Sequence, residues 1–594
     1  MADTPDLELG LIGNGQIAAL IDPLGRLVWS CLPRFDAEPA FSRLINGADR
    51  GHFSIELRDQ CAASQSYGRN TAILHTELTD RYGAVLRITD FCPRFQQYAR
   101  TYRPVMIIRR LEVLRGHPVV RTRLRPVSGW DASAPATTRG SNHVRFLRHE
   151  QVLRVTTDAP LTHVLDETPF VVDAPLTFIL GPDESVRESV TAMGRRFLEQ
   201  TETYWRDWTR SLAIPFEWQP AVIRAAITLK LSAYEDTGAV VAALTTSIPE
   251  AADSGRNWDY RYCWLRDAYF TVHALNRLGA TRTMEGFLRY IINLVAASGD
   301  HRLQPLYGIG GERRIEETTA DALTGYRGMG PVRVGNAAYH QIQHDVYGTV
   351  ILAATQAFFD ERLERPGDRA LYQRLCALGA EAIQRYDQPD AGIWEYRGRA
   401  RVHTYSAMMC WAACDRLRRI AERLGLDGDA ADWAGHAATI HATICREAWS
   451  ASQGAFVESF GGDTLDASLL LMHELGFLAA DDPRFVGTVE AIEGGLRRGD
   501  HLFRYAAADD FGRPENAFNI CTFWFIDALQ AIGRGEEARR LFENMLGHRT
   551  QLGLLSEDLD PADGTLWGNF PQTYSMVGLI NSAMHLSRSW EESL

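Results

Sequence analysis

The chain has 594 residues, which is too long for one ordinary hydrophobic core, so we expect two to four domains. Its net charge of -13 argues against a nucleic acid or an anionic membrane surface as a partner. Hydrophobic residues make up 45% and charged residues 23%, as in soluble globular proteins. The first residues are polar and acidic, and no apolar stretch has transmembrane length, so we expect a cytoplasmic protein.

Short segments of apolar and β-branched residues, broken by Gly, Pro, Asp and Asn, fill the chain from about residue 9 to 182. Segments such as 72–78 and 105–111 are strand signals at the spacing of a sandwich. We therefore predict an antiparallel β-sandwich domain over residues 1–185. A helical stretch rich in aromatic residues follows, and we assign residues 186–215 to a helical linker.

Helical periodicity dominates residues 216–594, which we predict to form the second domain. The expected helical segments are 220–235, 265–279, 281–298, 337–362, 367–385, 403–424, 428–448, 464–475, 482–497, 516–533, 535–547 and 570–588. Every connection into an even-numbered segment is long, whereas the other connections have only a few residues. Six helical hairpins closed into a ring, an (α/α)6 toroid, would give this pattern with the long loops at one end. An irregular helical bundle or a helical solenoid is the alternative.

The reactive residue types disfavour several kinds of chemistry. Cys410 and Cys414 are the closest pair of cysteines, and no Cys-x-x-Cys occurs, so buried free thiols are expected. His340 and His344 share a helix face without a zinc motif around them, so we expect no metal. Lys230 is the only lysine, and it lies in an apolar helical run without a Gly-rich loop. Nucleotide-dependent and pyridoxal-type chemistry are therefore disfavoured, and we expect no cofactor.

The long loops of the helical half carry aromatic and paired polar side chains. These runs are, in chain order, 256–267, 323–328, 394–395 and 503–510, followed by Glu557. A sugar presents apolar ring faces and a rim of hydroxyl groups, so its site needs aromatic platforms and side chains that hydrogen-bond in pairs. Arg266 and Asp267 offer planar donor and acceptor groups, and the ring surface comes from Tyr260, Trp264 and Trp394. The alternatives are core packing for the aromatic residues and a helix-start ion pair for Arg266 and Asp267.

Two glutamates in unlike settings indicate an acid/base pair. Glu395 is flanked by Trp394 and Tyr396, so desolvation should raise its pKa and keep it protonated. Glu557 lies in a polar Ser-Glu-Asp run that should favour the anion. This division of roles suits the hydrolysis of a glycosidic bond. The alternative for either glutamate alone is a solvated loop carboxylate.

One sequence motif is specific enough to indicate a protein family. Asp259-Tyr260-x3-Trp264-x-Arg266-Asp267 resembles the Arg-Asp motif of glycoside hydrolase family 15, the glucoamylases, whose bacterial branch also includes trehalases and isomaltose-type glucohydrolases. The resemblance covers nearly the whole chain. Residues 12–15 and 31–36 look like the start of the family's β-sandwich domain, and residues 568–572 look like its last helix.

The resemblance implies a role for each matching residue. Trp394-Glu395 matches the general acid, and Leu555-Ser556-Glu557 matches the general base. The residues that match the pocket of the non-reducing-end glucose are Tyr260, Trp264, Arg266 and Asp267, with Arg504 and Tyr505 near its far side.

The chain departs from the family pattern in two places. It has Ser406-Ala407-Met408-Met409 where Ser-Lys-x-Met is expected, and Tyr574-Ser575-Met576 where Phe-Ser-His is expected. Both departures could reshape the pocket wall without removing a catalytic carboxylate. The longest connection, about residues 299–336, carries Tyr307, Tyr326 and Arg327, which we expect to wall the pocket beyond the first glucose.

The sequence therefore predicts an inverting, exo-acting α-glucosidase that releases β-glucose from small α-glucosides. Its carboxyl groups should lie about 6.5–9.5 Å apart, because a water must fit between base and sugar. A trehalase and an enzyme for α-1,6-linked, isomaltose-type substrates are alternatives in the same class, and a non-catalytic sugar-binding protein is an alternative from another class. The linkage, the chain length of the substrate and the oligomeric state stay open.

Overall fold

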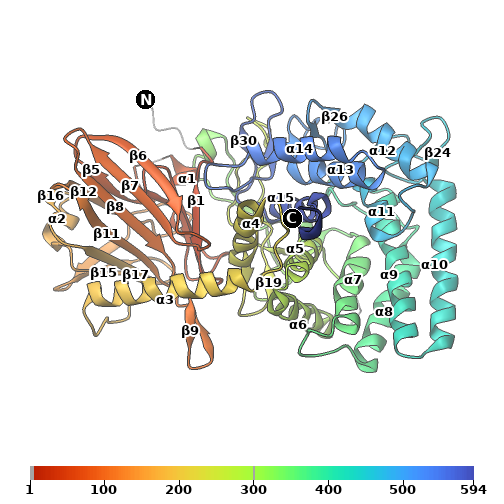
Figure 1. Ribbon diagram of the computed structural model, residues 1–594, viewed down its shortest axis with the longest axis horizontal. Coiled ribbons are helices and arrows are strands. Elements are labelled where there is room, and N and C mark those ends of the chain that lie inside the picture. Colours follow the sequence, from red (N-terminus) through yellow and green to blue (C-terminus); the bar gives the residue numbers. More distant parts are fainter. Residues whose placement is uncertain (1–5, 48, 299–301, 594) are drawn as a thin grey trace.

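The computed structural model describes residues 6–47, 49–298 and 302–593. A strand-rich part formed by the N-terminal third of the chain lies beside a helical part formed by the remainder, along the long axis of the molecule (Figure 1). The predicted order, antiparallel sheets first and helices after them, is confirmed.

Two large antiparallel sheets and the small hairpin of β9 (Phe95–Gln97) and β10 (Arg100–Tyr102) make up the described strand-rich part. The first has the order β1-β2-β3-β5-β12-β16, with β4 paired to β3, and the second has the order β13-β14-β15-β17-β11-β8-β7-β6. The strands of the first sheet are β1 (Gly10–Gly13), β2 (Ala18–Ile21), β3 (Leu27–Cys31), β4 (Pro39–Phe41), β5 (His52–Leu57), β12 (Val119–Arg125) and β16 (Phe170–Val171). Those of the second are β6 (Gln60–Tyr67), β7 (Leu74–Asp80), β8 (Val85–Phe91), β11 (Ile107–Arg115), β13 (Ala136–Arg139), β14 (His143–Leu147), β15 (Val152–Thr157) and β17 (Leu176–Gly181).

The two sheets share one core. Phe53 of β5 meets Phe178 of β17 edge to face, with their ring centroids 5.3 Å apart. Arg109 of β11 is fully buried beside them; it pairs with Asp90 at 2.7 Å and donates a hydrogen bond to the Phe53 carbonyl at 2.6 Å. A buried charge is tolerated when it is paired and fully hydrogen-bonded, so this arginine ties the sheets together.

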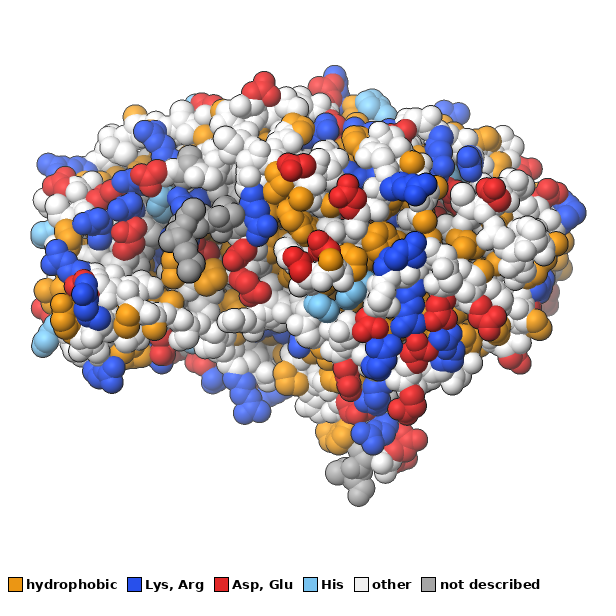
Figure 2. All heavy atoms as spheres, turned by 90° about the horizontal axis from the view of Figure 1, so that it is seen from above, with side chains coloured by type: hydrophobic (Ala, Val, Ile, Leu, Met, Phe, Trp, Pro, Cys, Tyr) orange, Lys and Arg blue, Asp and Glu red, His pale blue; other side chains and the backbone are white. Residues whose placement is uncertain are grey.

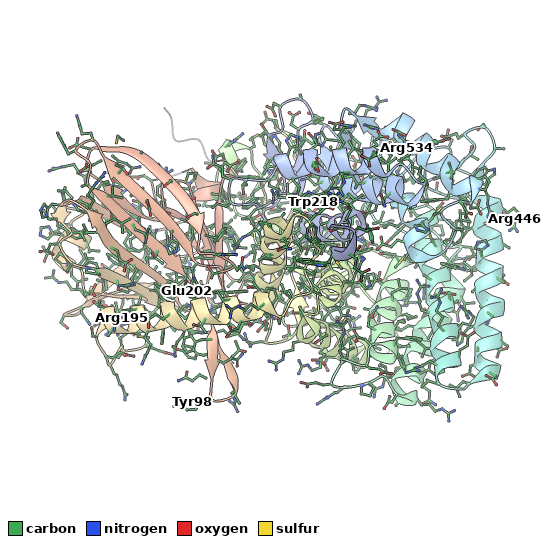
Figure 3. All side chains as sticks on the ribbon, viewed as in Figure 1. Tyr98, Arg195, Glu202, Trp218, Arg446 and Arg534 are labelled. Atoms are coloured by element: carbon green, nitrogen blue, oxygen red, sulfur yellow. The ribbon has the colours of Figure 1, made fainter. Side chains whose placement is uncertain are left out.

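Helix α3 (Val190–Arg210) runs beneath both parts (Figure 1). Phe197, in its first half, packs into a small cluster with residues of the second sheet, whereas Trp205, in its last turns, belongs to the core of the helical part. Arg195 and Glu202 lie on this helix in Figure 3. The predicted boundaries near residues 185 and 215 fall in the connections on either side of α3, and as domain limits they stay predictions.

The helical part contains a helix for nearly every predicted segment. The helices are α4 (Gln219–Leu231), α5 (Leu265–Arg277), α6 (Thr281–Ala297), α7 (Asp345–Phe359), α8 (Arg369–Arg385), α9 (Thr404–Arg423), α10 (Asp427–Glu447), α11 (Met472–Leu475), α12 (Pro483–Leu496), α13 (Asn519–Ala531), α14 (Gly535–Gly547) and α15 (Thr573–Leu586). Six elements form a closed circuit of neighbours: α5 contacts α7, α7 contacts α9, and the chain of contacts continues through the 3-10 helix η3 (Ala467–Leu471), α13 and α15 back to α5. Most of the remaining helices pack against the outside of this circuit.

Two predicted helices differ from the structure. The segment predicted from residue 337 begins as a 3-10 turn, η2 (Ala337–His340), and α7 starts only at Asp345, because Asn336 caps η2 and the chain leaves it extended at Gln341. The segment predicted over 464–475 is η3 followed by the single turn of α11. In the first case the interruption leaves Gln341 partly exposed, whereas Gln343 and His344 are buried.

One face of the molecule carries charges of both signs among hydrophobic side chains (Figure 2). On the face seen in Figure 2, basic and acidic side chains are interspersed over both parts of the molecule. In the described residues, no helix combines the length and the apolar character that a membrane crossing requires.

Arg261 joins the strand-rich part to the helical part. Its side chain is fully buried, donates to Asp259 at 2.9 and 2.7 Å and to the Ala37 carbonyl at 2.8 Å, and lies 4.9 Å from the centre of the Trp130 ring. Asp259 also accepts from the Gly335 backbone N–H at 3.1 Å. One ion pair therefore fixes three segments that are distant in sequence.

We predict that Arg261→Leu destabilises the protein by about 3–5 kcal/mol, because it leaves the Asp259 carboxylate buried without its partner. The free energy of unfolding, measured by denaturant titration, checks this. Arg195→Leu, a change at an exposed arginine of α3, is the matched control and should stay within about 0.5 kcal/mol of the wild type. Equal stability of the two variants would contradict the role given to Arg261.

Candidate active site

A cavity of about 840 Å³, counting the open space at its mouth, lies where the long loops before α5, α7, α9, α13 and α15 meet. The charged and aromatic residues that line it are Glu250, Arg256, Trp258, Tyr260, Trp264, Arg266, Asp267, Trp394, Glu395, Tyr396, Arg397, Arg504, Asp509, Asp510, Phe511, Phe518, Glu557 and Tyr574. The long-loop end of the helical part thus carries the concave, polar site that the loop pattern predicted.

Glu395 stands on the loop before α9. Its backbone has a φ of 62°, a left-handed conformation that residues other than glycine rarely adopt and that is found where a side chain must be aimed. The Trp264 indole N–H donates to Glu395 Oε1 at 2.5 Å, and an Arg266 guanidinium nitrogen lies 3.5 Å from the same oxygen. Burial raises the pKa of Glu395 against the lowering effect of Arg266, so the predicted direction of its shift is confirmed.

The desolvation of Glu395 has a different source from the one predicted. Trp394, its sequence neighbour, turns its indole N–H to the Asp466 carboxylate at 2.7 Å. Tyr396 stacks on His403, with the ring centroids 5.7 Å apart. The Glu395 carboxyl instead contacts Trp264, which caps α5, Arg266 in the first turn of α5, and Gln343.

Glu557 is almost fully buried, and its setting corrects the sequence-based expectation. The polar Ser-Glu-Asp run suggested an ionised carboxylate, but Ser556 donates its hydroxyl to the Asp558 carbonyl and does not contact the Glu557 carboxyl. Burial, followed by the nearby charge of Glu250, raises the pKa of Glu557 to about 8. The Tyr260 hydroxyl donates to Glu557 Oε1 at 2.7 Å and opposes this rise.

Tyr260 and Trp264 bring the two glutamates into one cavity. Their rings meet edge to face with centroids 5.3 Å apart, while one hydroxyl holds Glu557 and one indole holds Glu395. The two glutamates are 162 positions apart in the sequence, whereas Tyr260 and Trp264 are only four positions apart. One short segment therefore holds both carboxyl groups and sets their spacing in the cavity. The separation of about 6.5–9.5 Å expected between the carboxyl groups stays a prediction.

Arg266 and Asp267 lie at the start of α5 and are more than nine-tenths buried. Arg266 donates to the Gln343 amide oxygen at 3.2 Å and lies 3.5 Å from Asp345. Arg266 Nε and Asp267 Oδ1 have no hydrogen-bond partner although both are buried. These two atoms face each other as an ion pair at 3.4 Å. Burial also raises the pKa of Asp267 to about 6.

Four predicted pocket residues, Tyr307, Tyr326, Arg327 and Tyr505, do not line the cavity. Tyr326 is fully buried and packs against Trp567, with centroids 6.2 Å apart, and Arg327 lies over the same ring. The turn that carries them is bound to the strand-rich part, because the Gly325 N–H donates to the Ile45 carbonyl at 2.9 Å. The expectation that Tyr326 and Arg327 wall the pocket is therefore wrong.

Tyr505 stands behind the pocket wall. Its ring packs 5.5 Å from Tyr396 and 6.3 Å from Trp394, and its hydroxyl donates to Asp509. Its predicted neighbour Arg504 does line the cavity, where it pairs with Glu250. Tyr307, expected on the same wall as Tyr326, is also fully buried and is not among the lining residues.

Several lining residues were not predicted. Glu250 follows an unremarkable Ile-Pro pair and gives no sequence signal, yet it accepts from the Trp258 indole at 2.9 Å and pairs with Arg504. Asp510 accepts from the backbone N–H groups of Arg397 and Gly398, at 2.7 and 2.9 Å, and so ties two loops together at the rim. Among the described residues, no three His, Cys, Asp or Glu side chains are grouped to hold a metal ion.

Comparison with protein-family models gives two matches. Residues 219–584 match the family of glycosyl hydrolases family 15, and residues 2–126 match the trehalase-like N-terminal family. The first match spans the helical part from α4 to near the end of α15, and the second lies within the strand-rich part.

Curated proteins similar over almost the full length are named trehalases. The chain is 32% identical to the trehalase of Mycolicibacterium smegmatis over 99% of this chain and 92% of that protein. It is 31% identical to the trehalase of Mycobacterium tuberculosis over 99% and 90%, and 30% identical to that of Thermoplasma volcanium over 98% and 93%. Among solved structures, a bacterial glucoamylase complexed with acarbose has a TM-score of 0.69 at 14% identity, covering 98% of this chain and 95% of that one. That likeness concerns the fold alone.

We predict that Glu557→Gln is more stable than the wild type, and that this difference in the free energy of unfolding grows as the pH rises from 4.5 to 8. In the wild type the unfolded chain releases this proton near pH 4.5, whereas the folded protein holds it to about pH 8, so folding loses about 1.4 kcal/mol per pH unit within this window. The glutamine has no proton to lose. Melting temperatures of both proteins at pH 4.5 and 8 measure the effect.

Glu543→Gln, at a largely exposed carboxylate of α14, is the control and should show no such divergence. A melting-temperature difference between Glu557→Gln and the wild type that is the same at both pH values would contradict the burial cost assigned to Glu557.

Proposed function

The chain belongs to glycosyl hydrolase family 15 and is a glycoside hydrolase, and from that premise we propose that it is a trehalase, which hydrolyses the α,α-1,1 bond between two glucose units. The single observation that carries the proposal is the similarity to proteins named trehalase over 98–99% of this chain, which includes the strand-rich part as well as the helical part. From the sequence we predicted a glucoamylase-like activity, with trehalase as the alternative. The names of the similar proteins favour trehalase.

The shape of the site supports a small substrate. The cavity is walled on the rim side by Trp258, Phe511 and Asp510, and Asp510 joins the loop of Glu395 to the loop before α13. Arg333 and Arg397 lie over the Trp258 ring at 5.1 and 4.3 Å, which fixes that wall. A pocket closed on this side suits a disaccharide better than a long polymer, which would need an open cleft.

The proposed chemistry is a direct displacement with inversion. Glu395, kept protonated by burial, donates its proton to the glycosidic oxygen. Glu557 takes a proton from a water molecule that attacks the anomeric carbon from the opposite face. Trp264 and Tyr260 hold these two carboxyl groups in position, and Arg266 lies beside Glu395, where its positive charge favours the carboxylate left after proton donation.

Glucose recognition is proposed for the residues around these carboxyls. Arg266 and Asp267 both line the cavity and form an ion pair with each other at 3.4 Å, and their planar donor and acceptor groups suit adjacent hydroxyl groups of the first glucose. Tyr260, Trp264 and Trp394 supply ring surface, and Arg504 supplies a cation on the far side. Tyr505 would act on the site through Trp394, which it contacts.

The architecture proposed for the helical part is an (α/α)6 toroid. The closed circuit of contacts from α5 through α7, α9, η3, α13 and α15 supports it, and so does the fold likeness to the bacterial glucoamylase. In this arrangement the inner elements begin at the long loops, so their N-terminal ends surround the cavity.

We expect trehalose to be cleaved faster than maltose, isomaltose or maltopentaose when released glucose is measured. With inversion, the attacked glucose leaves as the β anomer and its partner leaves as the α anomer, so the first products seen by NMR should be equal amounts of both. Two α anomers would indicate retention. Faster cleavage of maltopentaose than of trehalose would restore the glucoamylase-like assignment.

Glu395→Gln should lower kcat on trehalose by about 10²- to 10⁴-fold, because the leaving sugar loses its proton donor. The same variant should recover much of its rate on α-D-glucosyl fluoride, since fluoride departs without a proton. Glu557→Gln should show no such recovery, because it lacks the base whichever group leaves. An equal response of the two variants to the fluoride would contradict the assignment of acid and base.

A further inference from the structure

Three carboxyl groups form one buried cluster on the Glu557 side of the cavity. Glu250, Glu557 and Asp558 are 6%, 1% and 2% exposed, respectively. A Cβ placed on Gly568 would lie 2.7 Å from Glu557 Oε2 and 3.2 Å from Asp558 Oδ2, so both oxygens face the same bare backbone. Glu250 is near enough for its charge to act on both of the other carboxyl groups.

There are too few positively charged side chains around the cluster to neutralise all of its carboxyl groups in their ionised form. Arg504 pairs with Glu250 and reaches the other two only through space. Arg256 is held by Asp509, to which it donates at 2.8 and 2.6 Å, and it lies 3.9 Å from Glu250. Two guanidinium groups thus face four carboxyl groups. Since a buried carboxylate without a compensating partner neutralises by taking up a proton, the cluster should retain one.

The hydrogen bonds indicate which group holds that proton. Glu250 is satisfied as an anion, because Arg504 and the Trp258 indole both donate to it. Glu557 accepts from the Tyr260 hydroxyl and, at 3.4 Å, from the Asn569 N–H. Asp558 Oδ2 is buried and has no hydrogen-bond partner. Asp558 is therefore the member whose ionised form the surroundings stabilise least, and burial raises its pKa well above the usual range.

A second, small cavity reaches Asp558 from outside. It is lined by Glu250, Arg256, Phe511 and Asp558, and also by Arg513 and Glu515, which are exposed. Glu250, Arg256 and Phe511 line both this small cavity and the main cavity. Asp558 lines the small cavity but not the main cavity. Solvent can thus exchange a proton with Asp558 without passing the bound sugar.

We propose that Asp558 is a positioning residue that keeps its proton when Glu557 has already lost its own, and thereby lets its neighbour Glu557 ionise first and act as the base. The proposal rests on the proposed function. When Glu557 takes the proton of the attacking water, the oxygen of that water bonds to the anomeric carbon, the glycosidic C–O bond breaks, and the leaving oxygen takes the proton of Glu395. The proton on Glu557 then returns to solvent, and Glu395 regains one.

The test is the pH dependence of kcat/KM for trehalose, whose acidic limb reports the ionisation of Glu557 in the free enzyme. Asp558→Asn has the shape of the protonated acid and no proton to lose, so this limb should stay within about 0.3 pH units of the wild type. Glu250→Gln removes a negative charge that opposes ionisation of Glu557, so the limb should move down by about one unit. Glu515→Gln, at the exposed end of the small cavity, is the control and should not move it.

A second measurement does not depend on activity or substrate. At pH 7 the infrared spectrum of the wild type should contain a protonated-carboxyl C=O band that Asp558→Asn lacks and Glu515→Gln retains. An identical band in Asp558→Asn and the wild type, or a downward shift of the acidic limb in Asp558→Asn, would show that Asp558 is ionised and would overturn the proposal. If trehalose is not cleaved at all, the proposed function fails, while the infrared band still decides the state of Asp558.

Discussion

The hydrogen bonds that Trp264 and Tyr260 donate to Glu395 and Glu557 are the contacts on which the site depends. The two glutamates come from loops before α9 and α15, far apart in the chain, and nothing in their own segments fixes their separation. Both donors lie on the one segment that also carries Arg266 at the start of α5. A single rigid segment therefore sets the geometry of the cavity.

That segment is rigid because it is buried from both sides. Asp259 and Arg261 form a buried ion pair within it, and Arg261 extends to the Ala37 carbonyl in the strand-rich part. The strand-rich part thus has a structural role in the site, although none of its residues lines the main cavity.

The site works against the stability of the fold. Glu395, Glu557, Asp558 and Asp267 all have pKa values raised chiefly by burial, so each ionises less readily here than in water. The same burial suits the proposed acid Glu395, because a general acid must hold its proton at neutral pH, but it opposes the ionisation that the proposed base Glu557 needs. Because burial acts on both glutamates, the different roles proposed for them must come from their different neighbours. Arg266 lies beside Glu395. Glu557 accepts from the Tyr260 hydroxyl and weakly from the Asn569 N–H, and it lies near the carboxyl groups of Glu250 and Asp558.

Local sequence determined the strands, the helices and the loops that carry the chemistry, because apolar periodicity follows from which face of each element is buried. It also gave the residues around Arg266 and Asp267 through a motif. It could not give the partners of each side chain. Tyr326 stands on the longest loop but packs on Trp567 beside the strand-rich part, Glu250 has no motif yet lies in the site, and the polar run around Glu557 is buried. Only the tertiary structure decided these contacts, because burial and charge balance depend on groups that are distant in sequence.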